Sequence, residues 1–223
     1  MNFSYSLTPL GLTLKVACIS TLLAFLAGVS LAFLVARKKF WGRELLDSLA
    51  TLPLVLPPTV MGYYLIVVWG RNGWLGRWLH DVLGISLMFT WQGAVLAAAL
   101  VSFPLVYKAA RAAFEEVDKN QENVARTLGL SEAAVFRRVS LPLALRGIIA
   151  GTMLAFARSM GEFGATLMLA GNLPGKTQTL ALAIYDAVQS GNDNLALSLV
   201  VVVSGACILI LVASGKILRF SLK

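Results

Sequence analysis

Residues 122–131 have the sequence ENVARTLGLS and lie near the middle of a charge-dense block that covers residues 108–142. The block ends in VSLP at residues 139–142. In the whole chain of 223 residues, 58% are hydrophobic and only 13% are charged, whereas soluble domains contain about 25% charged residues. A strongly apolar chain therefore keeps one large polar surface, and we expect a soluble partner to bind there.

Long apolar runs flank this block on both sides. Uncharged runs cover Val16–Ala36, Ser48–Gly70, Ile85–Tyr107 and Leu195–Gly215. About 20 helical residues cross the ~30 Å hydrocarbon core of a bilayer, and a helix satisfies its own backbone there. A fifth apolar run, Gly147–Ala170, contains two charged residues. We therefore expect an all-α integral membrane protein, one domain over residues 1–223, with about five spans near residues 10–36, 48–70, 85–107, 147–170 and 195–215.

Basic residues are divided unequally between the two sets of loops. Residues 37–43, 108–146 and 216–223 contain fourteen Lys and Arg, whereas the opposite loops contain Arg71, Arg77 and Lys176. Cytoplasmic loops carry the excess of positive charge. We predict a cytoplasmic C-terminus and an external N-terminus. The net charge of +8 is thus explained by topology, and a nucleic-acid partner is not expected because the cations are spread over three loops.

Missing motifs exclude several other functions. Residues 171–177, GNLPGKT, have three residues between the glycines, where a phosphate-binding loop needs four. Cys18, Cys207 and His80 lie far apart in the sequence and form no metal-ligand spacing. The two related halves of many secondary transporters are absent as well. We therefore expect a non-enzymatic subunit of a larger assembly, with no metal, cofactor or nucleotide site of its own.

The polar block contains signals for two helices. Composition favours a first helix over about Lys108–Leu128, which Gly129 would end. Ser131 is a suitable N-cap for a second helix, and Pro142 opens the next span. These signals alone leave two interpretations open: an amphipathic loop helix at the membrane surface, or a docking element.

The spacing within this block resembles the signature of importer-type ABC permeases. That signature has a Glu-Ala-Ala stretch, a Gly, nine residues, an aliphatic residue, one residue and Leu-Pro. Gly129 and Val139 have the required separation. The position of the family's Glu is occupied by Asn123, with Glu122 one residue earlier. The resemblance implies docking into a groove of a cytoplasmic ATPase, through a coupling set of Glu122, Ala125, Gly129, Ser131, Val139, Leu141 and Pro142.

Two further segments resemble the oxyanion branch of that family. They are LPLVLPPTVMGY at residues 52–63 and LAFARSMGEFGAT at residues 154–166. GEFGAT, with NLPGKTQT at residues 172–179, is most similar to molybdate permeases; sulfate and tungstate stay as alternatives. The resemblance implies a type I importer fold in the inner membrane, a second copy of the chain, ATPase subunits that bind ATP and Mg, and an external substrate-binding protein.

These segments also contain the candidates for a translocation path. Pro57 and its neighbouring prolines must interrupt the second span, either as a packed kink or as a break that frees backbone donors for an anion. Arg158 and Glu162 are four residues apart and can pair. Charged residues within a span are costly and usually functional. Their pair could serve as a gate, contact substrate, or be a static buried pair. Thr59 and Thr166 complete the candidate set.

Other points stay open at this stage. Gly147 and Gly151 permit close helix approach, within the chain or between subunits. Residues 177–190 could form an outer helix, a re-entrant piece or part of a sixth crossing, although a sixth crossing conflicts with the charge distribution. Rival functions are a membrane scaffold or sensor that recruits a partner through residues 108–142, and a self-contained channel or carrier.

Overall fold

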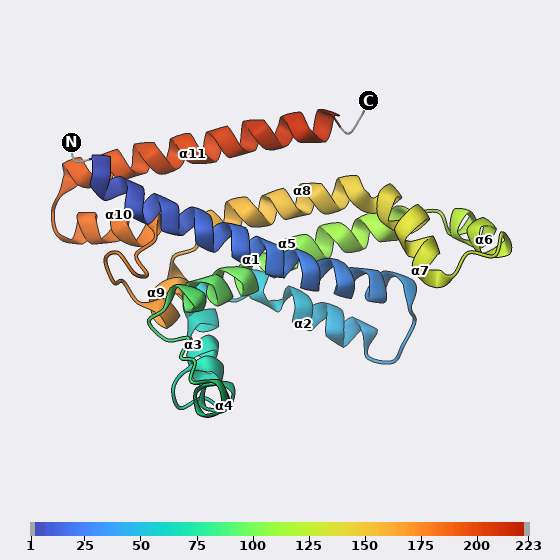
Figure 1. Ribbon diagram of the computed structural model, residues 1–223, viewed down its shortest axis with the longest axis horizontal. Coiled ribbons are helices and arrows are strands. Elements are labelled where there is room, and N and C mark those ends of the chain that lie inside the picture. Colours follow the sequence, from blue (N-terminus) through green and yellow to red (C-terminus); the bar gives the residue numbers. More distant parts are fainter. Residues whose placement is uncertain (1–2, 221–223) are drawn as a thin grey trace.

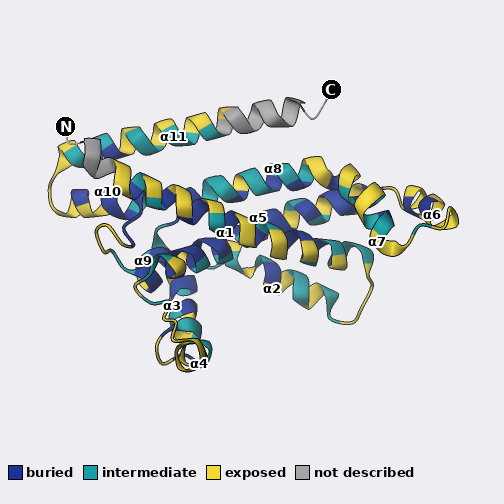
Figure 2. Cartoon of the chain, viewed as in Figure 1, coloured by how far each residue is buried: buried dark blue, intermediate teal, exposed yellow. Residues whose placement is uncertain are grey.

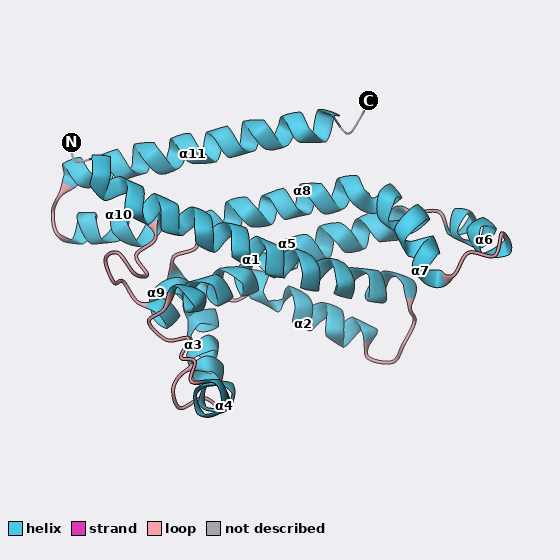
Figure 3. Ribbon diagram, in the orientation of Figure 1, coloured by secondary structure: helices cyan, strands magenta, loops and turns pink. Residues whose placement is uncertain are grey.

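The computed structural model describes residues 3–220, and the side chains of residues 7–210 and 212. Every regular element in residues 3–220 is helical (Figures 1 and 3). Of the tail cations used above, Lys223 lies outside the described residues, and so do the side chains of Lys216 and Arg219. The elements are α1 (Phe3–Arg37), α2 (Arg43–Val55), α3 (Pro58–Trp69), α4 (Trp74–Leu83), α5 (Trp91–Glu116), α6 (Lys119–Thr127), α7 (Glu132–Val135), the π-helical turn η1 (Phe136–Ser140), α8 (Leu141–Met160), α9 (Gly164–Ala170), α10 (Leu180–Gln189) and α11 (Asp193–Phe220).

The all-α membrane fold with about five spans is confirmed. Within the described residues, four helical segments are long and apolar enough to cross a bilayer: Leu7–Arg37, Trp91–Glu116, Glu132–Met160 and Asp193–Ile210. A bent pair, α2 with α3, supplies the fifth. Helices α1, α5 and α8 run along the long axis and pack on one another, with α6 and α7 at one end (Figure 1). The bundle thus presents the polar block at one tip.

Three of the five spans differ in detail from the predicted ones. Residues 48–70 are bent by 117° where α2 meets α3, because Pro57 and Pro58 cannot continue a helix. The span predicted from residue 85 begins at Trp91 instead, where the Thr90 hydroxyl accepts a hydrogen bond from the Gly93 N–H at 3.2 Å. The predicted span over residues 147–170 ends at Met160 and resumes at α9.

The single helix predicted over about residues 108–128 is also wrong. Helix α5 continues only to Glu116, and a separate helix, α6, begins at Lys119. Asp118 separates them, and its carboxylate accepts the Asn120 N–H at 2.9 Å as an N-cap. Short polar side chains of this kind satisfy the free N–H groups of a first turn. The membrane span and the polar helix are therefore two separate helices joined by a short non-helical link at residues 117–118.

The core of the bundle is built by small and aromatic side chains, and its inward faces are buried in Figure 2. A Cβ atom on Gly147 would lie 2.6 Å from the Ala113 Cβ, and one on Gly151 would overlap Ala109. Both glycines thus serve packing of α8 on α5 within the chain. Apolar side chains on the outer faces are exposed, as lipid-facing spans require.

The open question about residues 177–190 has a structural answer. Helix α10 covers ten of these residues and packs on α11 and α1. Its first N–H, from Leu180, donates to the Thr13 hydroxyl at 2.8 Å. Ten helical residues extend about 15 Å, roughly half the hydrocarbon core. The segment is therefore too short to form a crossing by itself.

Candidate functional site

Two residues that were predicted from the sequence, Gly129 and Ser131, form the turn between α6 and α7. Gly129 adopts φ +83°, a conformation that is strained for residues with a side chain. The Leu130 N–H donates to the Ala125 carbonyl and the Gly129 N–H to the Arg126 carbonyl, which is the Schellman pattern of helix termination. The Ser131 hydroxyl then accepts the Ala134 N–H at 3.4 Å as the N-cap of α7. The predicted stop and start are both confirmed.

The two faces of α6 differ in exposure. Val124 and Leu128 are 58% and 77% exposed, whereas Glu122 and Ala125 are only 3% and 6% exposed. Two members of the predicted coupling set thus point into the protein and lack the exposure that an outer contact needs. Gly129 and Ser131 are exposed at the tip. The exposed apolar residues here are instead Val124 on α6 and Leu128 at its C-cap, which the family motif did not single out.

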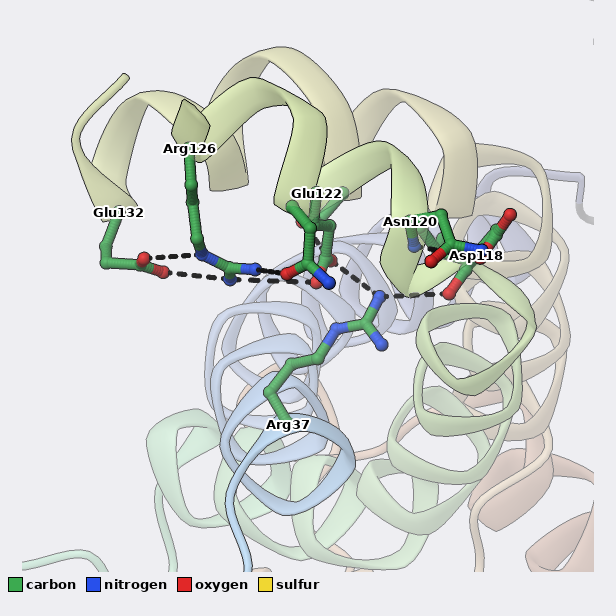
Figure 4. Close-up of polar contacts among 9 residues, drawn as sticks. Arg37, Asp118, Asn120, Glu122, Arg126 and Glu132 are labelled. Atoms are coloured by element: carbon green, nitrogen blue, oxygen red, sulfur yellow. Dashed lines mark hydrogen bonds and ion pairs between the residues drawn. The ribbon is translucent and has the colours of Figure 1, made fainter. Parts of the chain in front are cut away.

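Glu122 lies at the centre of a buried polar cluster (Figure 4). Its Oε1 atom pairs with Arg37 Nη2 at 2.6 Å and accepts the Ser140 hydroxyl at 2.6 Å. The Arg37 Nη2 atom also donates to the Val117 carbonyl at 3.4 Å. Sequence reasoning missed Arg37 because it lies 85 positions before Glu122; the available signal was a charged residue at the end of a long apolar run.

A more exposed ion pair extends from the same side of α6, where Arg126 Nη2 also lies 3.8 Å from Glu122 Oε2. Arg126 donates from Nε and Nη2 to the two carboxylate oxygens of Glu132 at 2.7 and 3.1 Å (Figure 4). The hydrogen bond that Arg126 donates to Glu132 raises the pKa of Arg126 above its usual value. Arg126 also donates to the Asn123 side-chain oxygen at 2.9 Å. Asn123, the departure from the family pattern, is thus exposed and bonded within the motif.

The remaining coupling candidates form the entrance to α8. Pro142 is exposed, and Val139 and Leu141 are half-buried. The π-helical turn η1 lies just before Pro142, and the Leu141 N–H donates to the Phe136 carbonyl. A proline ring crowds the carbonyl four residues earlier, and the wider π turn relieves that crowding. Beneath this turn, the Phe136 ring lies 4.5 Å from Phe33, centroid to centroid.

Two breaks in the spans lie against each other at the other end of the bundle. A Cβ atom on Gly164, at the start of α9, would lie 2.9 Å from the Pro58 Cβ at the start of α3. One on Gly62 would lie 2.6 Å from the Met168 Cβ. The two short helices therefore pack closely side by side. Pro57 and Thr59 are exposed beside this junction.

A charged pair occupies the α8–α9 break. Arg158 Nη1 lies 2.8 Å from Glu162 Oε2; the Glu162 side chain is 2% exposed and the Arg158 side chain 35%. The Glu162 Oε1 atom accepts the Ala165 N–H at 2.9 Å. The two residues pair as predicted, although across the end of α8 and not along one helix. Thr166 is 1% exposed, which leaves no open hydroxyl for a path.

Comparison with known proteins agrees with this architecture. The family model described as "Binding-protein-dependent transport system inner membrane component" matches residues 24–222. The chain is 46% identical over 211 residues to the molybdenum transport system permease protein ModB of Escherichia coli (strain K12), covering 94% of the chain and 92% of the relative. It is 37% identical over 201 residues to the sulfate transport system permease protein CysW of Synechococcus elongatus, with coverages of 90% and 70%.

Solved structures share the fold at low sequence identity. An inward-facing structure of the MetNI methionine ABC transporter matches with a TM-score of 0.76 and 16% identity, covering 99% of both chains. A bacterial alginate ABC transporter, in complex with a pentasaccharide-bound periplasmic protein, matches with a TM-score of 0.77 and 14% identity, covering 96% of this chain and 78% of that one. From the family match and the 46% identity, the chain belongs to the inner membrane components of binding-protein-dependent transport systems.

Proposed function

We propose that this chain is the permease subunit of an ATP-driven importer whose substrate is molybdate. The observation that carries the substrate is the 46% identity to a molybdenum transport permease over nearly the whole chain. The sulfate permease relative is less similar, at 37%. Sulfate and tungstate are the alternatives, because all three substrates are tetrahedral dianions. In this proposal ATP and Mg are bound by the ATPase partner, and the permease performs no chemistry.

Energy enters through the tip formed by residues 119–131. Exposed Val124 and Leu128, with the Gly129 turn, give this tip an apolar contact face. A short helix that places apolar side chains into a groove of a partner is a recurring mode of recognition. In the proposed cycle, the ATPase favours one of two membrane states by its differential affinity for them. The coupling face thus consists of outward residues of α6 and the turn, with Ser131 at its edge.

The substrate path follows the two breaks. Arg158 is about one third exposed at the level of a span, and a charge in such a position requires water or a partner. Glu162 holds this cation and also caps α9. A cation that is paired in this way retains little net charge to trap a dianion. We therefore assign the pair to gating, with Pro57 and Thr59 beside it on the path.

The proposed assembly contains two copies of this chain, two ATPase subunits and one external binding protein. The tip of α6 and the cation-rich segments at residues 37–43 and 108–146 face the cytoplasm in this arrangement, and the N-terminus faces outward. The charge distribution supports this orientation. A cysteine at the fully exposed Trp41 should react with an impermeant thiol reagent only from the cytoplasmic side.

Vesicle uptake tests the function directly. The purified permease, ATPase and binding protein are reconstituted, and uptake of labelled molybdate is measured with and without ATP. We expect uptake only with all components, and stronger competition from unlabelled molybdate or tungstate than from sulfate. Flux without the ATPase would indicate a channel or carrier, whereas ATPase binding without any oxyanion uptake would indicate a scaffold.

A further inference from the structure

The buried carboxylate of Glu122 joins four elements of the fold. Glu122 lies on α6, and Arg37 is the last residue of α1. Val117 is the C-cap of α5, and Ser140 ends the π turn that leads into α8. All of these groups are linked by hydrogen bonds or ion pairs of 2.6–3.4 Å. Three membrane-spanning helices therefore end at one point beneath α6.

Glu122 has no surface to offer to a partner. Its side chain is 4% exposed and that of Arg37 is 12% exposed. The nearby Arg126–Glu132 pair is far more open, with side chains 39% and 74% exposed. Exposed ion pairs contribute little to stability, whereas removal of one partner from a buried pair leaves an uncompensated charge. The buried pair is therefore the stronger polar connection between α6 and the membrane bundle.

The positions of the hinges explain why such a connection matters. Helix α6 is joined to α5 through residues 117–118 and to α7 through residues 128–131, and neither joint is helical. A nine-residue helix between two such joints could tilt without moving the spans. The carboxylate contacts with Arg37 and Ser140 oppose that tilt, because they tie the middle of α6 to α1 and η1.

We infer that Glu122 is a positioning residue for energy coupling: with Arg37 and Ser140 it locks α6 to the spans, so that α6 and the membrane helices move as one body. This inference rests on the proposed function. It assigns Glu122 to transmission behind the contact face. The carboxylate position next to the family's Glu thus acts inward, while Asn123 faces outward.

The test uses the reconstituted transporter and measures uptake and ATP hydrolysis together. Glu122→Gln keeps the shape and removes the charge. We expect the ATPase to bind and hydrolyse ATP, but uptake per ATP to fall on the order of tenfold, within the usual range of coupling between sites. Glu115→Gln is the matched control, because the Glu115 carboxylate pairs with Arg43 of α2 and Arg111 of α5. Its uptake per ATP should stay at the wild-type value.

Two further variants keep the test decisive if Glu122→Gln folds poorly. Ser140→Ala removes one hydrogen bond to the carboxylate and should lower uptake per ATP by a smaller factor. Reversal of the pair, Arg37→Glu with Glu122→Arg, should recover part of the loss seen with either change alone. A thermal melt of each complex shows which variants are folded.

The possible outcomes separate the inference from the proposed function. If folded Glu122→Gln or Ser140→Ala showed the wild-type ratio of uptake to ATP hydrolysis, the inference would be overturned, because the cluster would then be only structural. Loss of ATPase binding in a folded Glu122→Gln permease would overturn it as well, because Glu122 would then act in docking. Absence of any ATP-dependent uptake by the wild-type complex would defeat the proposed function instead.

Discussion

Two buried carboxylates are paired with arginines at opposite ends of this molecule, and their surroundings differ. Glu122 at the tip is held by Arg37 from a distant element, and both side chains are largely buried. Glu162 at the span break is held by Arg158 four residues earlier, which is 35% exposed. The first pair connects separate helices, whereas in the second pair the partly exposed Arg158 is held by a carboxylate only four residues away. In our proposals, similar chemistry serves transmission at one end and the substrate path at the other.

The largest effects should come from removal of either arginine. Arg158→Leu removes the cation from Glu162, and Arg37→Leu removes the close, buried cation from Glu122 and leaves the more exposed Arg126 at 3.8 Å. Breaking a buried pair in this way costs ~3–5 kcal/mol. We expect a decrease of that size in the free energy of unfolding for both variants, measured by thermal unfolding in detergent. Equal stability to wild type in Arg158→Leu would mean that Glu162 is not desolvated.

Removal of the carboxylates should separate the two pairs. Glu162→Gln leaves Arg158 one third exposed, where water can compensate it, and we expect a loss of ~1–2 kcal/mol. Glu122→Gln leaves Arg37 buried, so the loss should approach ~3 kcal/mol. The comparison fails if the two glutamine variants melt at the same temperature, because the difference in exposure of the arginines would then have no consequence.

A smaller effect is expected at the turn beyond α6. Gly129 has φ +83°, and no atom lies within 4 Å of a Cβ atom built there. Gly129→Ala therefore introduces backbone strain alone, about 1–2 kcal/mol. Gly205→Ala, in the interior of α11 with similar open space, is the control and should be neutral or slightly stabilising. A neutral result at Gly129 would show that the turn is not needed to end α6.

The smallest effect is expected for an ion pair that is open to solvent. The Glu115 side chain is 42% exposed and lies 2.9 Å from Arg111. Glu115→Gln should cost less than about 1 kcal/mol, since exposed pairs contribute little. High salt screens such charges, so the difference from wild type should vanish in melts at 1 M NaCl. A larger loss of stability in Glu115→Gln would mean that this exposed pair contributes as much as the buried Glu122–Arg37 pair, and the contrast between exposed and buried pairs would fail.

Local features of the chain were predictable, and long-range ones were not. The apolar runs, the stop at Gly129 and the cap at Ser131 depend on residues that are adjacent in sequence, and all appear in the structure. The break at Asp118 was also encoded locally, as an N-cap before a polar helix, but the helix-forming composition on both sides obscured it.

The direction of each site residue required the tertiary structure. Glu122 is inward because Arg37, 85 positions away, lies beneath α6. Thr166 is buried because α9 packs against α3 and α5 after the break at residues 161–163. Motif spacing predicts which segments hold the candidate sites, but only the packing distinguishes the exposed side of a helix from the buried side.

The central claim is that the outward face of α6 connects an ATPase to oxyanion uptake. Its most direct test is ATP-dependent molybdate uptake by vesicles that contain the complete transporter with Leu128→Glu in the permease. Leu128 is 77% exposed, so the permease should fold, but ATPase binding and uptake should both be lost. The control, Trp41→Glu at a fully exposed apolar side chain outside α6 and its turn, should retain both. Wild-type uptake in Leu128→Glu would contradict the account.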